Sequence, residues 1–219
     1  MDFRPGEKTR DGYLALPPSG SGPGVVVFHA WWGLNEFVVE LCDRLAAEGF
    51  VALAPDLSGG AVAVTIPEAE ALKNTLNFSE MGEKALGACD FLSEHPGVTG
   101  DKIGAMGFSM GAESTLLLAT KRSESVAASV LFYGVGEADF TQSRCAYLCH
   151  FGEDDEWDPV DQAREMEARM RAAGRDVTLH VYPGAGHWFF EANQPDAYVP
   201  EAAQLAWDRT VSFLNTQLL

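Results

Sequence analysis

The sequence lacks the features that define membrane and secreted proteins. No apolar run approaches the roughly 20 residues that a membrane-spanning helix needs. Residues 1–12 are polar and contain no apolar core of a secretory signal, so we expect a soluble chain in the cytoplasm. The 219 residues also contain no repeat, no low-complexity tract and no linker. We therefore expect one domain over residues 1–219.

Basic residues are few. Lys and Arg total 15 against 32 Asp and Glu, which gives a net charge of −17. Such a surface repels phosphate backbones and anionic lipid head groups, so it disfavours nucleic acid and membranes as partners and favours a small-molecule substrate. The same charge disfavours anionic substrates unless a local basic pocket corrects the field. For assembly, we expect a monomer or a small homo-oligomer.

Cysteine is scarce as well, and none of the four cysteines lies in a CxxC pair. Without a secretory context, small buried thiols are expected rather than disulfides at Cys42, Cys89, Cys145 and Cys149. Cys145 and Cys149 share one face of an expected strand with His150 beside them, which raises a metal site as an alternative. Their spacing fits no zinc signature, and we expect neither a metal nor another cofactor.

Apolar, β-branched runs alternate with helical patterns along the chain. Strands are expected at residues 24–29, 50–54, 102–108, 126–133, 145–151 and 177–182. Helices are expected at residues 36–48, 67–92 with an internal break, 111–120, 159–173 and 201–218. This alternation predicts the α/β class, with a mostly parallel central sheet and helices on both faces.

Gly107, Ser109 and Gly111 form a GxSxG motif between an expected strand and an expected helix. In a nucleophile elbow the chain turns so tightly that the serine takes a strained backbone conformation, and the positions beside it must be small. The helix begins under the serine, and its N-terminal N–H groups favour negative charge that develops there. The alternative is a tight strand-to-helix turn with an incidental serine.

A nucleophilic serine on this fold needs an acid and then a histidine downstream. Asp155 and His187 each follow an expected strand, at the sheet edge where parallel sheets carry their sites. His187 would take the proton from Ser109, and the carboxylate would fix the histidine tautomer. Most other carboxylates of residues 153–158 are expected to be solvated, and this run lacks the spacing of a calcium-binding loop.

None of the remaining histidines is a candidate for the catalytic base. His29 ends a buried strand, so it is expected to be structural or to support the site. His95, His150 and His180 are expected at the surface or in satisfied hydrogen bonds.

Five segments together resemble the dienelactone hydrolase family of α/β-hydrolases, over roughly residues 20–218. They are residues 29–35, 54–57, 107–111, 151–155 with Pro159, and 182–187. The resemblance implies a single-domain α/β-hydrolase fold and selects Asp155 over Asp154 as the acid. It also implies that the backbone N–H groups of Trp31 and Met110 form an oxyanion hole.

Three positions depart from the family pattern. The family's namesake enzymes use a cysteine nucleophile where this chain has Ser109, and a glutamate where it has Ala30. A hydroxyl needs only the histidine to activate it, so the two changes are coherent. The namesake enzymes also hold an anionic lactone with arginines, and one of those positions is Glu191 here. With Lys73 the only cation between Asp56 and Glu83, a neutral substrate is expected.

Aromatic residues gather in the loops that carry these motifs. Plain core packing explains part of this, and an apolar substrate pocket explains the rest. The residues expected to wall the pocket are Trp32, Trp157, Trp188 and Phe189, with Trp31 at the oxyanion hole. The sequence thus predicts a serine-dependent hydrolase of small neutral carboxylic esters or lactones. The alternatives are a carboxymethylenebutenolidase-type dienelactone hydrolase and a catalytically inactive binding module on the same scaffold.

Overall fold

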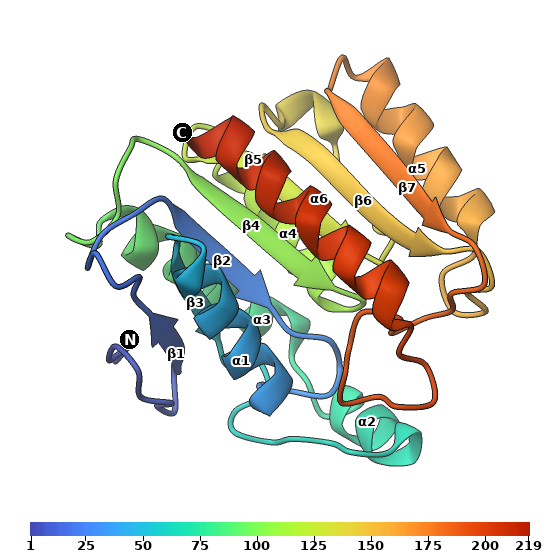
Figure 1. Cartoon of the computed structure of the whole chain (residues 1–219), viewed down its shortest axis with the longest axis horizontal. Coiled ribbons are helices and arrows are strands. Elements are labelled where there is room, and N and C mark those ends of the chain that lie inside the picture. The colour runs from blue at the N-terminus through green and yellow to red at the C-terminus, as the bar shows by residue number, and fades with distance from the viewer.

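Seven strands form one sheet at the centre of the computed structural model, which describes residues 1–219 (Figure 1). The strands are β1 (Gly12–Ala15), β2 (Gly24–Phe28), β3 (Val51–Pro55), β4 (Ile103–Phe108), β5 (Val126–Phe132), β6 (Ala146–Gly152) and β7 (Val177–Tyr182). Their order across the sheet is β1-β3-β2-β4-β5-β6-β7, and only the β1–β3 pairing is antiparallel. Strands β2, β3, β4 and β6 are buried along their whole length, as strands with both faces covered require.

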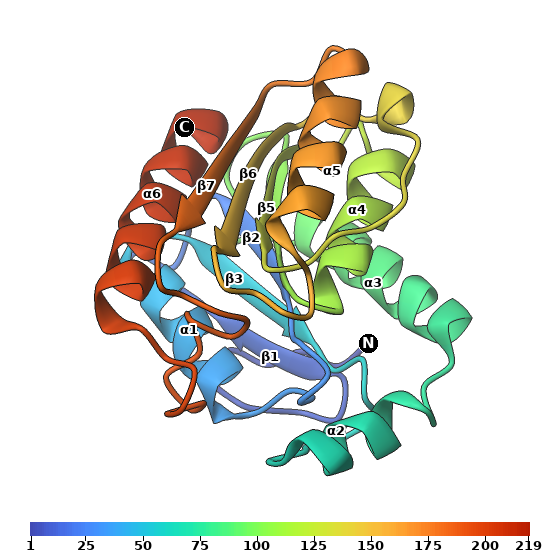
Figure 2. The same ribbon diagram turned by 90° about the vertical axis from the view of Figure 1, so that its right-hand side faces the viewer.

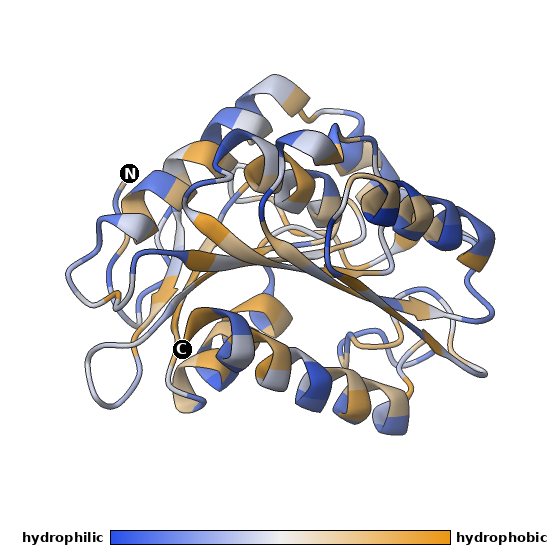
Figure 3. Ribbon diagram, turned by 90° about the horizontal axis from the view of Figure 1, so that it is seen from above, coloured by the Kyte–Doolittle hydropathy of each residue, from blue (hydrophilic) through white to orange (hydrophobic).

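Helices cover both faces of the sheet. One face is covered by α1 (Glu36–Ala47) and α6 (Pro200–Leu218), the other by α3 (Phe78–Ser93), α4 (Gly111–Lys121) and α5 (Val160–Ala172) (Figure 2). Seen along its edge, the sheet lies between these two helical layers (Figure 3). The predicted α/β class, with a mostly parallel sheet and two helical layers, is confirmed. No helix combines the length and the apolar character needed to cross a membrane.

Local sequence signals explain where the helices begin. The side chain of Asn35 accepts a hydrogen bond from the backbone N–H of Val38 and caps α1, whose apolar face is buried. Thr65 and Glu68 form a capping box at the start of α2 (Ile66–Lys73). Asn77 accepts hydrogen bonds from two backbone N–H groups and starts α3. These caps place the predicted break of residues 67–92 between Lys73 and Phe78.

Two elements were not expected from the sequence. Strand β1 has only four residues and pairs with β3 through its backbone, so its side-chain pattern is too short to indicate a strand. A short 3₁₀ helix, Phe140–Gln142, precedes β6. In addition, the sequence predicts a strand that includes Cys145, but β6 begins one residue later, at Ala146. Cys145 lies in the preceding loop, where its Sγ contacts the hydroxyls of Ser129 and Ser143.

Candidate active site

Ser109 lies in the tight turn between β4 and α4 and has a positive φ of 50°. Both neighbouring glycines are required by close backbone contacts. A Cβ added at Gly107 would lie 2.3 Å from the carbonyl oxygen of Gly111, and one at Gly111 would lie 2.4 Å from that of Phe28. No larger residue fits either position without movement of the backbone. The strained serine and small flanking residues match the predicted elbow.

His187 connects Ser109 to Asp155. The Nδ1 of His187 lies 2.8 Å from Asp155 Oδ2, and its Nε2 lies 2.9 Å from Ser109 Oγ. Because an ionised carboxylate only accepts, Nδ1–H donates to Asp155 and Nε2 accepts from the serine hydroxyl. The side chains of His187 and Asp155 are 3% and 0% exposed, so water competes little for these bonds. Three residues from three separate loops thus form one continuous chain of hydrogen bonds.

The acidic loop holds Asp155 in place and brings in a second carboxylate. Asp155 Oδ1 accepts hydrogen bonds from the backbone N–H groups of Trp157 and Asp158, each at 2.9 Å. Asp158 Oδ2 lies 3.9 Å from His187 Nδ1, and burial raises the pKa of Asp158. The acidic run was expected to be mostly solvated, which holds for Glu153, Asp154 and Glu156. The sequence does not indicate the partial burial of Asp158, because only the fold of the loop turns this side chain toward His187.

The loop after β2 brings Trp31 to the same place. His29 fastens this loop: its Nδ1 lies 2.7 Å from the carbonyl oxygen of Ala30, and its Nε2 accepts from the Leu57 N–H at 3.1 Å. Burial lowers the pKa of His29, which is consistent with a neutral ring that donates once and accepts once. The backbone N–H groups of Trp31 and Met110 donate to no acceptor within the protein. Both are therefore free to donate to a ligand beside Ser109.

A cavity of about 230 Å³ lies over Ser109. Its walls are formed by Trp31, Lys73, Ser109, Met110, Glu113, Val135, Trp157, Asp158, His187 and Trp188. Trp157 and Trp188 thus lie where the sequence predicted pocket walls. Trp32 and Phe189 do not. Trp32 is 2% exposed and packs behind Trp31 and Trp188, and Phe189 is fully buried against Tyr133 and Tyr182.

The tryptophans form one cluster rather than four separate walls. The rings of Trp31 and Trp188 stack with centroids 5.9 Å apart, and Trp157 contacts both rings while remaining 47% exposed. The indole N–H groups of Trp31, Trp32 and Trp188 are buried and have no hydrogen-bond acceptor. Together the indoles give this part of the cavity a largely apolar wall beside His187.

Glu191 stands at a position where the namesake enzymes hold an anionic lactone with an arginine, but here this residue lies away from the cavity. Glu191 does not line the cavity: it is 2% exposed and accepts a hydrogen bond from the Tyr133 hydroxyl at 3.0 Å. Burial raises the pKa of Glu191 to about 8. Tyr133 in turn contacts the ring of His187, with centroids 5.0 Å apart. Lys73, at the end of α2, is the one cation among the lining residues.

The other histidines and the cysteines lie outside this site. His150 is fully buried between the hydroxyls of Tyr182 and Thr210, so its hydrogen bonds are satisfied. His95 and His180 are partly exposed. All four cysteines are buried free thiols. No group of three or more His, Cys, Asp or Glu side chains has an arrangement that could hold a metal ion.

Known proteins resemble the chain in sequence and in fold. The family model described as the dienelactone hydrolase family matches residues 10–218. Protein usf from Aquifex pyrophilus is 35% identical over 224 residues, which cover 97% of this chain and 95% of that protein. A putative carboxymethylenebutenolidase from Aquifex aeolicus is 34% identical over 227 residues, with the same coverage of 97% and 95%. The crystal structure of a putative dienelactone hydrolase from Klebsiella pneumoniae has a TM-score of 0.82 and 27% identity, and the match covers 93% of this chain and 92% of that one.

Proposed function

The chain belongs to the dienelactone hydrolase family, and we propose that it is a single domain that cleaves small neutral carboxylic esters or lactones, with Ser109 as the nucleophile. The observation that carries this proposal is the hydrogen-bond chain Ser109–His187–Asp155, with distances of 2.9 and 2.8 Å. A serine hydroxyl becomes nucleophilic when a neighbouring base accepts its proton and a third group orients that base.

The proposed reaction has two halves. Ser109 Oγ attacks the ester carbonyl while its proton passes to His187 Nε2, and the N–H groups of Trp31 and Met110 receive the oxyanion. His187 then protonates the leaving alcohol, which leaves an acyl group on Ser109. Water attacks this acyl-enzyme with His187 as the base, and the acid is released. Asp155 stabilises the imidazolium in both halves.

Preference for a neutral substrate is supported by the charges around the cavity. Glu113 and Asp158 line it, and the whole chain carries −17. A substrate carboxylate would lose solvation there and meet two carboxylates. Trp31, Trp157 and Trp188 favour an apolar substituent instead.

One observation favours a second candidate, a dienelactone hydrolase of the carboxymethylenebutenolidase type. Lys73 lines the cavity beside Ser109, so an anionic lactone would find one cation to pair with, although the arginine position is occupied by Glu191. This activity would use the same serine. It differs from the first proposal in requiring Lys73 and in favouring the charged substrate over its neutral analogue.

The first test compares the wild type with Ser109→Ala on p-nitrophenyl acetate and butyrate. We expect the wild type to hydrolyse both esters, and the variant to retain only the roughly 10³–10⁴-fold rate over water that the oxyanion hole and binding provide. A fluorophosphonate probe should label the wild type and not the variant, because only an activated serine reacts. Near-wild-type turnover by Ser109→Ala would show that the chemistry lies elsewhere, and an unlabelled, inactive wild type would favour a binding module.

A further inference from the structure

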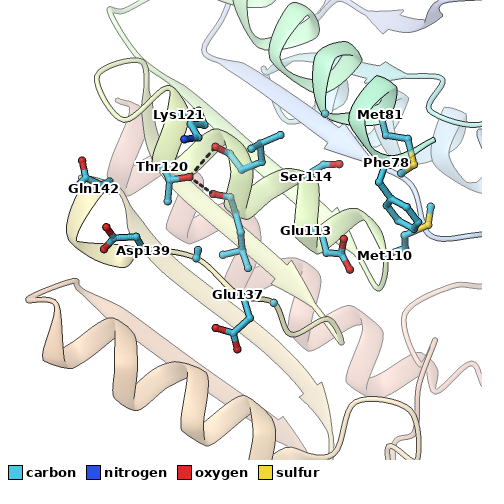
Figure 4. Close-up of a pocket in the computed structure, with 15 residues that line it drawn as sticks. Phe78, Met81, Met110, Glu113, Ser114, Thr120, Lys121, Glu137, Asp139 and Gln142 are labelled. Atoms are coloured by element: carbon cyan, nitrogen blue, oxygen red, sulfur yellow. Dashed lines mark hydrogen bonds between the residues drawn. The ribbon is translucent and has the colours of Figure 1, made fainter. Parts of the chain in front are cut away.

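A groove lies next to the catalytic cavity and is not part of it. It has a volume of about 960 Å³ and lies between the start of α3, the length of α4 and residues 136–142 (Figure 4). Met110 and Glu113 line both this groove and the 230 Å³ cavity over Ser109. The two spaces are therefore neighbours, and the residue whose N–H is proposed to bind the oxyanion, Met110, borders both.

The groove changes character along its length. Its end near Ser109 carries Phe78, Met81 and Met110, which lie together in Figure 4, with the polar residues Glu113 and Ser114 beside them. Leu116 and Leu117 of α4 extend this apolar surface. The far end is polar, and the residues there are Thr120, Lys121, Asp139 and Gln142. Phe78 is 49% exposed although it is aromatic, so it has little else to pack against.

The positions of the catalytic groups decide which part of an ester can enter the groove. The leaving oxygen must come within hydrogen-bond reach of His187 Nε2, so the alcohol part lies on the side of His187, Trp157 and Trp188. None of these three residues lines the groove. With the carbonyl oxygen held between Trp31 and Met110, the acyl part points away from His187, toward the wall that the cavity shares with the groove.

We propose that the groove along α4 is the acyl subsite and takes an unbranched apolar acyl chain of medium length. This proposal rests on the proposed ester hydrolysis. Helix α4 rises about 1.5 Å per residue, so the section that carries the apolar lining residues Met110, Leu116 and Leu117 is about 10 Å long. Beyond it a chain would meet Thr120 and Lys121. Glu113 at the entrance disfavours a carboxylate on the chain, whereas Glu137 is paired with Arg169.

The test uses p-nitrophenyl acetate, butyrate, octanoate and decanoate with the wild type. Burying one methylene group is worth up to about a fourfold gain in binding. We expect kcat/KM to rise at least about tenfold from acetate to octanoate, and to gain nothing further with decanoate. A flat or falling series from acetate to octanoate would overturn the proposal.

Two variants block the groove from opposite walls. Leu117→Trp enlarges a half-buried side chain on α4, and Gly82→Leu adds one on α3, where a Cβ would lie 3.3 Å from Leu117 Cδ2. Each variant should lose at least about tenfold in kcat/KM for octanoate while acetate hydrolysis changes by less than about twofold. The matched control is Leu205→Trp, at a residue 44% exposed on α6 across the sheet, which should change neither.

The outcomes separate this proposal from the one on which it rests. Retained acetate activity shows that a variant is folded and that the catalytic residues work. If both blocked variants keep the octanoate-to-acetate ratio of kcat/KM that the wild type has, the acyl chain lies outside the groove. If the wild type hydrolyses none of these esters in a Ser109-dependent way, the proposal that the protein is an ester hydrolase is itself wrong.

Discussion

At the residue scale, three residues other than glycine have a positive φ, namely Ser109 (50°), Tyr133 (36°) and Trp188 (62°). All three follow strands on the carboxyl side of the sheet and surround His187. Such conformations cost about 1–3 kcal/mol each and persist only where neighbouring bonds hold them. The N–H of Ser109 donates to the carbonyl of Phe132, and the N–H of Tyr133 to that of His150. The strain of the backbone is thus concentrated at the candidate site.

The two carboxylates near His187 should differ greatly in importance. Asp155→Asn removes the carboxylate that fixes the histidine tautomer at 2.8 Å, so we expect kcat to fall by about 10⁴-fold. Asp158→Asn changes a group at 3.9 Å, and we expect a loss of less than about tenfold. Asp154→Asn, at an exposed neighbour, is the matched control. Kinetics with p-nitrophenyl butyrate measure all three, and equal losses from the first two would contradict this division.

Glu191 should make stability depend on pH. Its pKa is raised from 4.5 to about 8 by burial, so the folded state holds a proton that the unfolded state releases. The stabilisation is complete below pH 4.5 and is lost as the pH rises through about 8, by at most about 5 kcal/mol. Glu191→Gln stays neutral, so its stability should overtake that of the wild type in alkaline buffer.

Urea unfolding at pH 5, 7 and 9 measures this effect as the difference between wild type and Glu191→Gln. The control is Glu156→Gln, at an exposed residue, because both variants lose one titratable carboxyl. If the difference between wild type and Glu191→Gln stays constant across this range, the carboxyl of Glu191 does not titrate as burial predicts.

At the element scale, side chains that accept backbone N–H bonds set the starts of α1, α2 and α3. Asn35 caps α1 directly after the loop that carries Trp31, so this cap also fixes where that loop ends. Helix α2 is held differently, since Ala69 is its only buried residue and the helix lies beyond the strand ends in Figure 1. The stability of α1 should therefore matter for the whole fold, whereas that of α2 should matter for the mouth of the cavity.

Removing the α1 cap should cost measurable stability. Asn35→Ala deletes the acceptor for the Val38 N–H, and we expect a loss of about 1 kcal/mol in the free energy of unfolding. The matched control is Asn74→Ala: this exposed side chain makes no capping bond, so the change should stay within about 0.5 kcal/mol. Urea unfolding at one pH compares them, and equal effects would show that the Asn35 cap contributes nothing specific.

At the scale of the whole molecule, the net charge of −17 sets a field around one small cavity. This field repels anionic substrates, and salt screens it over a distance of about 10 Å at 0.1 M. The single lining cation, Lys73, opposes it locally. The balance between these two effects decides whether anionic or neutral esters are preferred.

Substrate charge therefore provides a direct measurement. We expect kcat/KM for a neutral p-nitrophenyl ester to exceed that for its carboxylate-bearing analogue by at least about tenfold at low salt, and the ratio to shrink as NaCl is added. Lys73→Gln should enlarge the ratio. Preference for the carboxylate analogue that disappears in Lys73→Gln would instead support the dienelactone hydrolase candidate.

The sequence alone determined the α/β class and the order of the motifs. Strand and helix periodicity, caps and the elbow glycines are local properties, so residues close in the chain specify them without knowledge of distant contacts. The positions of Ser109, Asp155 and His187 after separate strands were also readable, because parallel strands bring their carboxyl ends to one edge. The edge strand β1 was not predicted, because it has only four residues and forms by pairing with β3.

Only the tertiary structure decided what surrounds those three residues. Whether Asp158 is solvated, whether Glu191 reaches Tyr133, and whether Trp32 and Phe189 face the cavity all depend on contacts between loops far apart in the sequence. The position of Lys73 in the cavity wall and the groove along α4 become visible only once α2 and α3 are placed beside Ser109. Residue type and spacing fix local geometry, whereas burial and electrostatic surroundings are properties of the packed molecule.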